Sequence, residues 1–335
     1  MDTRTTTTTK PDPGIAALAE FLKAQDDIAV LGHVSPDGDA AGSAIAVKLA
    51  LEHLGKRAVA ALPGGLPVRY AFLADGENVA DAAGPLPFAP KCAFAVDVAS
   101  LDRLGPAQAL FEGCPGKAAL DHHASNPGFA PLCVVDGSRA AAGELVLELI
   151  AALGVPLDAA MAENLFVAIS TDSGNFNFDN TSPATLRAAA VCVEAGANVE
   201  RLTRILYRTR RVQKTKLLGL VLSDMHVECA GRMCWARVTR EMYQQAEALR
   251  EDTDSIVNYL IEAEGVEIAF LAEERGPEET KFSLRSVAPW DVARDVCTPL
   301  GGGGHDRAAG ATLKQPMDAA VEVVRRRVRG LLEGR

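Results

Sequence analysis

The chain has 335 residues, of which 48% are hydrophobic and 23% charged, and its formal net charge is −10. This length exceeds one ordinary hydrophobic core and predicts a globular protein of two domains. No apolar stretch is long enough to cross a bilayer, and the acidic balance argues against a protein that coats long nucleic acid. A short phosphorylated substrate remains compatible with this charge, because a local basic pocket is enough to bind it.

Two features of the sequence bear on the cellular compartment of the protein: its first residues and its cysteines. Residues 1–13 hold a threonine run without an apolar core, so we expect a disordered leader and no signal peptide. The seven cysteines are dispersed and form no C-x-x-C pair, which favours buried thiols over a disulfide framework or a zinc knuckle. We therefore expect a cytoplasmic protein that has no membrane partner.

From residue 14 to about residue 200, apolar strands alternate with helices, a pattern typical of a parallel sheet covered by helices on both faces. The predicted strands are Ile28–Leu31, Ala58–Leu62, Cys92–Val96, Lys117–Leu120 and Leu132–Val135. The predicted helices lie at about Ile15–Gln25, Ala41–Gly55, Leu101–Leu104, Ala140–Leu153, Asp158–Ser170 and Ser182–Ala195. We therefore predict a doubly wound α/β domain over residues 14–200.

The turn after the first predicted strand holds three polar residues, His33, Asp37 and Asp39. In open α/β sheets, ligands bind at the carboxyl ends of the strands, where this turn lies. The alternative is a polar loop in which Asp39 serves only as the N-cap of the next helix. That alternative leaves a histidine and a second carboxylate unexplained, so we test a metal site against the rest of the chain.

Residues of the same kinds follow three further elements. Asp97 follows the strand at 92–96, the sequence DHH (121–123) follows the strand at 117–120, and Asp172 follows the helix at 158–170. Each carboxylate alone fits a helix cap or a turn, but four such features in one domain favour a metal site. The candidate ligands are His33, Asp37, Asp39, Asp97, His122 and Asp172. Six oxygen and imidazole ligands exceed the needs of one zinc ion and favour two Mn²⁺ or Mg²⁺ ions that share a carboxylate.

Beyond residue 200 the composition changes. The basic run 201–216 predicts a linker helix within residues 201–223, either an ordinary solvated surface or a guide for anionic substrates. Residues 224–335 predict a smaller α+β domain with a hairpin (225–229 and 233–238), a helix (255–264), a strand pair (266–273 and 281–287) and a closing helix (317–332). Two features of this domain suit phosphate binding. The first is Arg285, which lies on a predicted strand; the alternative is an ordinary surface arginine. The second is the glycine run 301–304, which is followed by His305.

Several motifs together resemble those of one family. HVSPDGDAAGS, the isolated Asp97, ALDHHASN and ISTDSGNF resemble, in this order, the four motifs of the DHH phosphoesterase superfamily. GGGGHDRAAG (301–310) resembles the signature of the DHH-associated C-terminal domain, so the resemblance covers nearly the whole chain. The compact layout is similar to that of oligoribonucleases that degrade nanoRNA and dephosphorylate 3′-phosphoadenosine 5′-phosphate (pAp). The resemblance implies two domains with a cleft between them.

The resemblance also implies roles for the metal ligands. It implies two Mn²⁺ ions, with Mg²⁺ as the alternative, and a bridging carboxylate from Asp97. The first ion has two further ligands, His33 and Asp37. The second ion has three further ligands: Asp39, His122 and Asp172. No role is assigned to the stretch 139–144.

For the remaining site residues the resemblance implies contacts around the substrate. Asp121 is expected to orient the imidazole of His122, as metal sites commonly require, and His123 is expected to face the substrate phosphate. The residues of the second domain that are expected to bind the substrate are Arg285, Gly302, Gly303, Gly304 and His305.

The implied activity is two-metal hydrolysis of short oligoribonucleotides to mononucleotides, together with removal of the 3′-phosphate of pAp. The alternatives are a cyclic or linear dinucleotide phosphodiesterase (acting on pApA or pGpG), an inorganic pyrophosphatase or polyphosphatase, and a non-catalytic nucleotide-binding module. The expected partners are short oligoribonucleotides and pAp, without long duplex nucleic acid or a membrane. A homodimer is left open.

Overall fold

The computed structural model describes residues 12–334. The predicted leader at 1–13 lies outside the described residues except for its last two, and of these Pro13 begins helix α1 (Pro13–Lys23). The chain divides into two compact units at the boundary between Arg208 and Thr209, and each unit is described by itself. Within residues 12–334, no helix has the length and apolar character that a membrane span requires.

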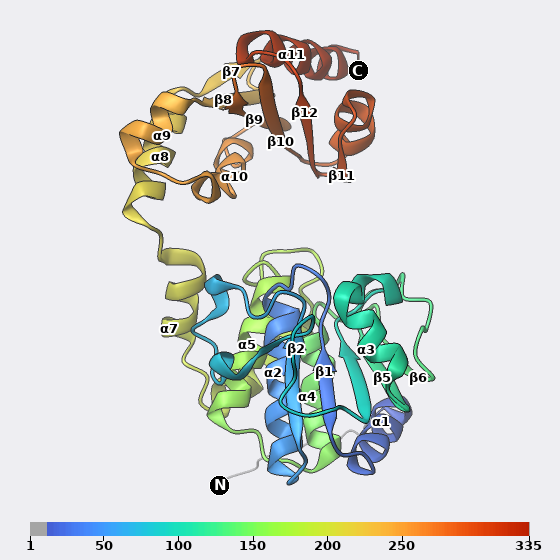
Figure 1. Ribbon diagram of the computed structural model, residues 1–335. Helices are drawn as coiled ribbons and strands as arrows, with labels where there is room; N and C mark the ends of the chain where they lie inside the picture. The colour runs from blue at the N-terminus through green and yellow to red at the C-terminus, as the bar shows by residue number, and fades with distance from the viewer. Residues whose placement is uncertain (1–11, 335) are drawn as a thin grey trace, which may run out of the picture. The chain divides into compact units, whose positions relative to one another are not determined.

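The first unit is built on a six-stranded, fully parallel sheet with the strand order β3-β2-β1-β4-β5-β6 (Figure 1). The strands are β1 (Ile28–Leu31), β2 (Ala58–Leu62), β3 (Ala80–Asp81), β4 (Cys92–Val96), β5 (Gly116–Asp121) and β6 (Leu132–Val135). The five predicted strands are confirmed, and only the two-residue edge strand β3 was not predicted. The strand order reverses between β1 and β4, which is where an open α/β sheet binds its ligands.

Helices cover both faces of this sheet, which confirms the doubly wound architecture. One face packs on α1, α2 (Gly38–His53) and α4 (Ala142–Leu153), and α5 (Ala159–Asp172) and α6 (Pro183–Glu194) extend the same core by packing on α2 and α4. The other face packs on the 3₁₀ helix η3 (Leu101–Ala107) and on α3 (Gln108–Gly113). In β1, Ile28 and Val30 face the first core, whereas Ala29 and Leu31 face the second. This alternation follows from the two-residue period of a strand.

The second unit holds a mixed six-stranded sheet in the order β11-β12-β10-β9-β8-β7. Its strands are β7 (His226–Glu228), β8 (Met233–Val238), β9 (Ile268–Gly276), β10 (Glu279–Ser286), β11 (Gly303–His305) and β12 (Ala308–Leu313). Helix α11 (Met317–Glu333) covers one face. Helices α8 (Val212–Ser223), α9 (Arg240–Ala246) and α10 (Ile256–Ile261) cover the other face over β8 and β9. Among the described residues, neither β10 nor β12 contributes to that second core.

Some predicted elements of the second half are wrong in detail. The basic run is not one helix, because α7 (Val199–Thr203) continues as a π-helical turn and a new helix begins only at Val212. Arg211, just before that helix, has an extended backbone and donates to Asp252 at 3.0 Å. The helix predicted at 255–264 is shorter, and α9 was not predicted. Part of the glycine run forms strand β11, because it pairs with β12.

Candidate active site

The turn between β1 and α2 carries the first candidate ligands. Asp37 is the N-cap of α2, because one of its carboxylate oxygens accepts from the backbone N–H groups of Asp39 and Ala40, at 3.0 and 3.1 Å. Its other oxygen lies 3.6 Å from Nε2 of His33. The alternative in which Asp39 caps the helix is therefore wrong. Asp37 fixes the helix end with one oxygen and keeps the other available at the site.

Asp39 is fully buried in the first turn of α2. Its carboxylate accepts from Oγ of Ser43 at 2.9 Å and from the backbone N–H groups of Ala142 and Gly143, the latter at 2.9 Å. These amides belong to the N-terminal end of α4, where unpaired N–H groups favour a negative charge. The stretch 139–144, to which the sequence assigned no role, thus holds this carboxylate in place. The sequence signal that was available is the small residue at position 143.

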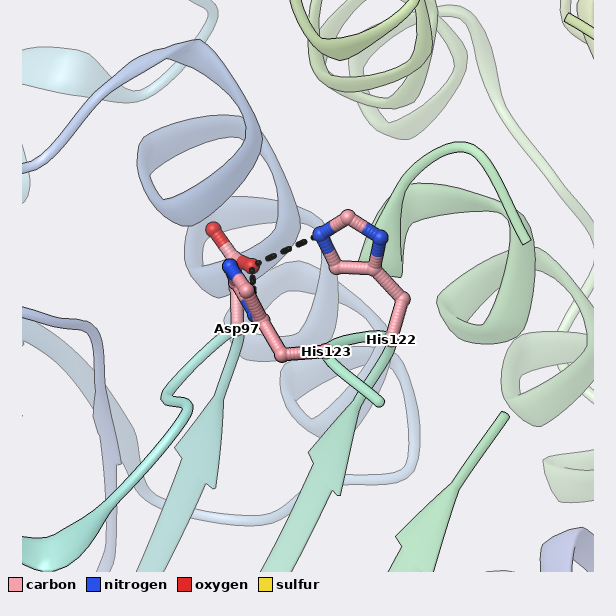
Figure 2. Close-up of side chains that lie close together, drawn as sticks. All are labelled: Asp97, His122 and His123. Atoms are coloured by element: carbon pink, nitrogen blue, oxygen red, sulfur yellow. Dashed lines mark ion pairs between the residues drawn. The ribbon is translucent and has the colours of Figure 1, made fainter. Parts of the chain in front are cut away.

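Asp97 lies at the end of β4 with a left-handed backbone (φ 57°), a conformation that Asp and Asn adopt more readily than most residues other than glycine. The side chain is 1% exposed. Its Oδ2 lies 3.5 Å from Nε2 of His33, and its Oδ1 lies 3.4 Å from Nε2 of His122. Figure 2 shows the carboxylate beside the imidazoles of His122 and His123. One carboxylate therefore faces two separate groups of ligands.

The two imidazoles present the same nitrogen to the site. Nδ1 of His33 donates to the carbonyl of Val34 at 2.8 Å, and Nδ1 of His122 donates to the carbonyl of Arg139 at 3.2 Å. A carbonyl can only accept, so a neutral ring keeps its proton on Nδ1 and a lone pair on Nε2. Among the described residues, Nε2 of His122 and Oδ1 of Asp97 are buried without a hydrogen-bond partner. A cation would satisfy both atoms, and the residues therefore fit a metal.

The six predicted ligands fall into two groups, and Asp97, a member of the first, also forms a group with His122 and His123. Within each group the ligand atoms lie within 4.8 Å of one another. The first group is His33, Asp37 and Asp97, and the second is Asp39, His122 and Asp172. Oδ1 of Asp97 connects the second group, 3.4 Å from Nε2 of His122. Carboxylate oxygens with imidazole nitrogens are a donor set that suits Mn²⁺ and Mg²⁺ better than a thiolate-seeking ion.

The ionisable groups of the site strongly shift the pKa values of one another. Burial by itself lowers the pKa of His33 and of His122, but neighbouring carboxylates outweigh burial and raise the two values to about 10 and about 12. Burial raises the pKa of Asp39 well above its usual range, and the charges of Asp97 and Asp172 act in the same direction. For Asp97, the two imidazoles outweigh burial and lower the pKa. Buried carboxylates this close together require positive charge to balance them.

The contacts of Asp121 differ from the prediction. We expected Asp121 to orient His122, but its Oδ1 accepts from Nδ1 of His123 at 2.8 Å. Its Oδ2 accepts from the side-chain amide of Asn126 at 2.8 Å. Adjacent residues at the end of β5 point in different directions, so Asp121 reaches the second histidine after it and not the first. Asn126, the last residue of ALDHHASN, is a positioning residue that our sequence reasoning did not single out.

In the second unit, Arg285 and His305 lie on the same face of the sheet. Arg285 pairs with Ala308 across β10 and β12, and Ala308 pairs in turn with His305 across β12 and β11. Directly paired residues point to the same side of the sheet, and on this side Arg285 meets Asn258 of α10. Only the alanine side chain separates the two residues across the strands.

Arg285 also borders a small polar pocket. Its Nε donates to the side chain of Asn258 at 3.0 Å, and burial lowers its pKa. The pocket has a volume of about 110 Å³, and its polar lining includes the carboxylates of Asp254 and Glu273 as well as Ser255, Lys281, Ser283 and Arg285. These side chains offer both donors and acceptors to the polar groups of a nucleotide.

The glycine run has a packing reason. A Cβ at Gly302 would lie 2.1 Å from the carbonyl oxygen of Gly310, and one at Gly304 would lie 2.6 Å from that of Ala308. At Gly303 a Cβ would meet open space. Two of the three glycines therefore allow β11 to approach β12 closely. Because β11 is the edge strand of the sheet, no strand of residues 12–334 pairs with its outer side.

Comparisons with known proteins agree with this geometry. The model of the DHH family, N-terminal domain, matches residues 27–169, and the model of the DHHA1 domain matches residues 234–330. The chain is 36% identical over 316 residues to the bifunctional oligoribonuclease and PAP phosphatase NrnA of Thermus thermophilus. This match covers 93% of this chain and 92% of the relative.

Two solved structures share the fold. An exopolyphosphatase-related protein from Bacteroides fragilis aligns with a TM-score of 0.84 at 24% identity, over 96% of this chain and 97% of that one. A structure of the exonuclease RecJ bound to manganese aligns with a TM-score of 0.52 at 16% identity, over 97% and 95% of the two chains. The architecture, the motifs and the relative from Thermus thermophilus lead to one conclusion. The chain belongs to the DHH family, carries a DHHA1 domain in its C-terminal part, and is a hydrolase of phosphoester bonds.

Proposed function

We propose that this protein hydrolyses short oligoribonucleotides to mononucleotides and removes the 3′-phosphate of pAp, using two Mn²⁺ or Mg²⁺ ions. The observation that carries this proposal is the shared carboxylate of Asp97, which faces His33 on one side and His122 on the other. The relative from Thermus thermophilus is described by its name as having both activities. An acidic chain with this local site suits small anionic substrates better than long strands.

The ligand residues have the task of holding two ions close together. Asp97 would be shared between the two ions, His33 and Asp37 would hold the first, and Asp39, His122 and Asp172 would hold the second. Bound divalent ions lower the pKa of a water molecule and stabilise negative charge on a phosphoryl group. The hydrogen bonds that Asp39 accepts, and those that Nδ1 of His33 and of His122 donate, fix the ligands before any ion binds.

His123 is the residue of this site that we assign to the substrate. Its imidazole is 40% exposed, whereas the side chain of Asp121 behind it is 1% exposed. The hydrogen bond from Nδ1 to Asp121 raises the pKa of His123, which favours the doubly protonated ring, and such a ring can donate through Nε2. An imidazolium held in this way can bind a phosphate oxygen or protonate a leaving oxygen.

We further propose that the second unit binds the same substrate through Arg285, His305 and the glycines Gly302, Gly303 and Gly304. Their common face on the sheet supports this assignment. A short oligonucleotide has a phosphate or base for each of these groups. A long strand gains little more, because its additional phosphates meet an acidic protein.

The experiment is product analysis with labelled RNAs of two to five nucleotides, pAp, inorganic pyrophosphate, pGpG and a 24-nucleotide RNA, each with added Mn²⁺. We expect mononucleotides from the short RNAs, AMP from pAp, and much slower turnover of the 24-mer. Faster hydrolysis of pyrophosphate than of any nucleotide would assign the protein to a different substrate class. Strong preference for pGpG alone would narrow it to a dinucleotide phosphodiesterase.

The role of the second unit is tested by His305→Ala. We expect kcat/KM on a dinucleotide to fall. The expected loss of transition-state stabilisation is roughly 1.5–3 kcal/mol, the contribution of a charge-assisted hydrogen bond. Hydrolysis of bis-p-nitrophenyl phosphate, which is too small to use this contact, should change much less. An equal loss on both substrates would contradict the proposed contact.

A further inference from the structure

Arg103 is an exposed arginine beside the ligand groups that the proposed mechanism does not use. It lies on η3, the 3₁₀ helix that follows β4 and Asp97. Its backbone position is fixed at both polar atoms, because its N–H donates to the carbonyl of Ser100 and its carbonyl accepts from the N–H of Val34. A side-chain substitution therefore leaves these backbone contacts in place.

The guanidinium of Arg103 lies 3.4 Å from Nδ1 of His33, the ring nitrogen on the side away from the ligand groups. This pair is not a productive hydrogen bond, because Nδ1 already donates to the carbonyl of Val34 at 2.8 Å. Two donors face each other, and neither can accept. Within residues 12–334, no carboxylate forms an ion pair with Arg103.

An arginine without an acidic partner is unexpected at this place. The chain has 44 acidic and 34 basic residues, so carboxylates are abundant, and the site itself is rich in them. The four ligand carboxylates balance two divalent ions, which leaves the loaded site without net positive charge. Arg103 supplies that charge next to His33. A guanidinium presents a planar fork of donors that matches phosphate oxygens.

We propose that Arg103 binds a second phosphate of the substrate, and not the phosphoryl group that is attacked. The guanidinium lies behind Nδ1 of His33, whereas the attacked group must lie on the side of Nε2, toward Asp37 and Asp97. In pAp the second group is the 5′-phosphate, and in an oligonucleotide it is a neighbouring phosphodiester. Arg103 thus makes the first unit selective for substrates with two anionic groups. This inference rests on the proposed function.

The test compares pAp with 3′-AMP, which has the same scissile phosphate but no 5′-phosphate. We expect Arg103→Ala to lower kcat/KM for pAp by roughly 10- to 100-fold, mainly through KM, and to change that for 3′-AMP by less than about threefold. Arg103→Lys should restore part of the loss, because an ammonium keeps the charge but not the fork. Arg187→Ala, at an exposed arginine of α6, is the matched control and should change neither substrate.

Mn²⁺ binding to the metal-free protein is the second measurement. We expect Arg103→Ala to bind Mn²⁺ as tightly as the unchanged protein or more tightly, because a positive charge beside His33 has been removed. Weaker Mn²⁺ binding would assign Arg103 to holding His33, and equal losses on pAp and 3′-AMP would place it at the attacked group. Either result overturns the inference. If the unchanged protein leaves pAp intact, the proposed function fails, and equilibrium binding of pAp against 3′-AMP still tests Arg103.

Discussion

Replacing Asp97 by Asn removes one negative charge and preserves nearly everything else at the centre of the site. Asn tolerates the left-handed backbone that Asp97 adopts, so the change adds no conformational strain. The two carboxylate oxygens lie 3.5 and 3.4 Å from the imidazole nitrogens of His33 and His122. Unit charges at this separation interact by about 4–5 kcal/mol at an effective dielectric constant of about 20.

A loss of about 4 kcal/mol corresponds to roughly a thousandfold in affinity. We therefore expect Asp97→Asn to bind Mn²⁺ about a thousandfold more weakly, to lose at least one of two ions, and to retain almost no turnover. Isothermal titration of the metal-free protein with Mn²⁺ measures both the affinity and the number of ions. Circular dichroism and thermal unfolding establish that the variant is folded.

Asp27→Asn is the matched control for this experiment. Asp27 is also buried, also has a left-handed backbone (φ 53°), and forms ion pairs with Arg57 and Lys91. Its substitution should lower the free energy of unfolding and leave Mn²⁺ binding unchanged. The reasoning is refuted if Asp97→Asn binds two ions with the affinity of the unchanged protein, or if both variants weaken Mn²⁺ binding equally.

Three further predictions follow from contacts and pKa shifts in the first unit. Asp121→Asn should lower kcat by about 10- to 100-fold, because it removes the charged partner of His123. Calorimetry should find an Mn²⁺ affinity within about threefold of that of the unchanged protein. A large loss of Mn²⁺ affinity would contradict the observed contact. Gly42→Ala should lower the free energy of unfolding by about 1–3 kcal/mol, because the new Cβ would lie 2.3 Å from a carbonyl oxygen of α5. In the control Gly219→Ala the new Cβ meets open space, so thermal unfolding should find this variant as stable as the unchanged protein or more stable. Mn²⁺ affinity should rise between pH 6 and pH 9, because the imidazoles of His33 and His122 have pKa values of about 10 and about 12 without metal and must release protons to bind the ion. Calorimetry in two buffers measures this proton release. An Mn²⁺ affinity that does not change with pH would contradict the prediction.

The identity of the ligands could be predicted from the sequence because the sheet is parallel. In such a sheet the carboxyl ends of all strands share one edge, so polar residues after β1, β4 and β5 must converge. Asp97 and His122 follow β4 and β5 directly, His33 follows β1 after one glycine, and these apolar strands are easily recognised. The five strands were predicted for the same reason, since buried parallel strands are continuous apolar runs.

Contacts made across the fold could be decided only by the tertiary structure. The sequence places Asp121 next to His122, but the direction of each side chain depends on how the chain leaves β5, and that direction gives Asp121 to His123. Asp39 is held by amides of α4, about a hundred residues further along the chain. Arg103 reaches His33 in the same way, through the crossover of β4 beside β1. Local sequence patterns determine which residues end each strand. Which residues of different elements contact each other depends on strand order and packing, which no local pattern encodes.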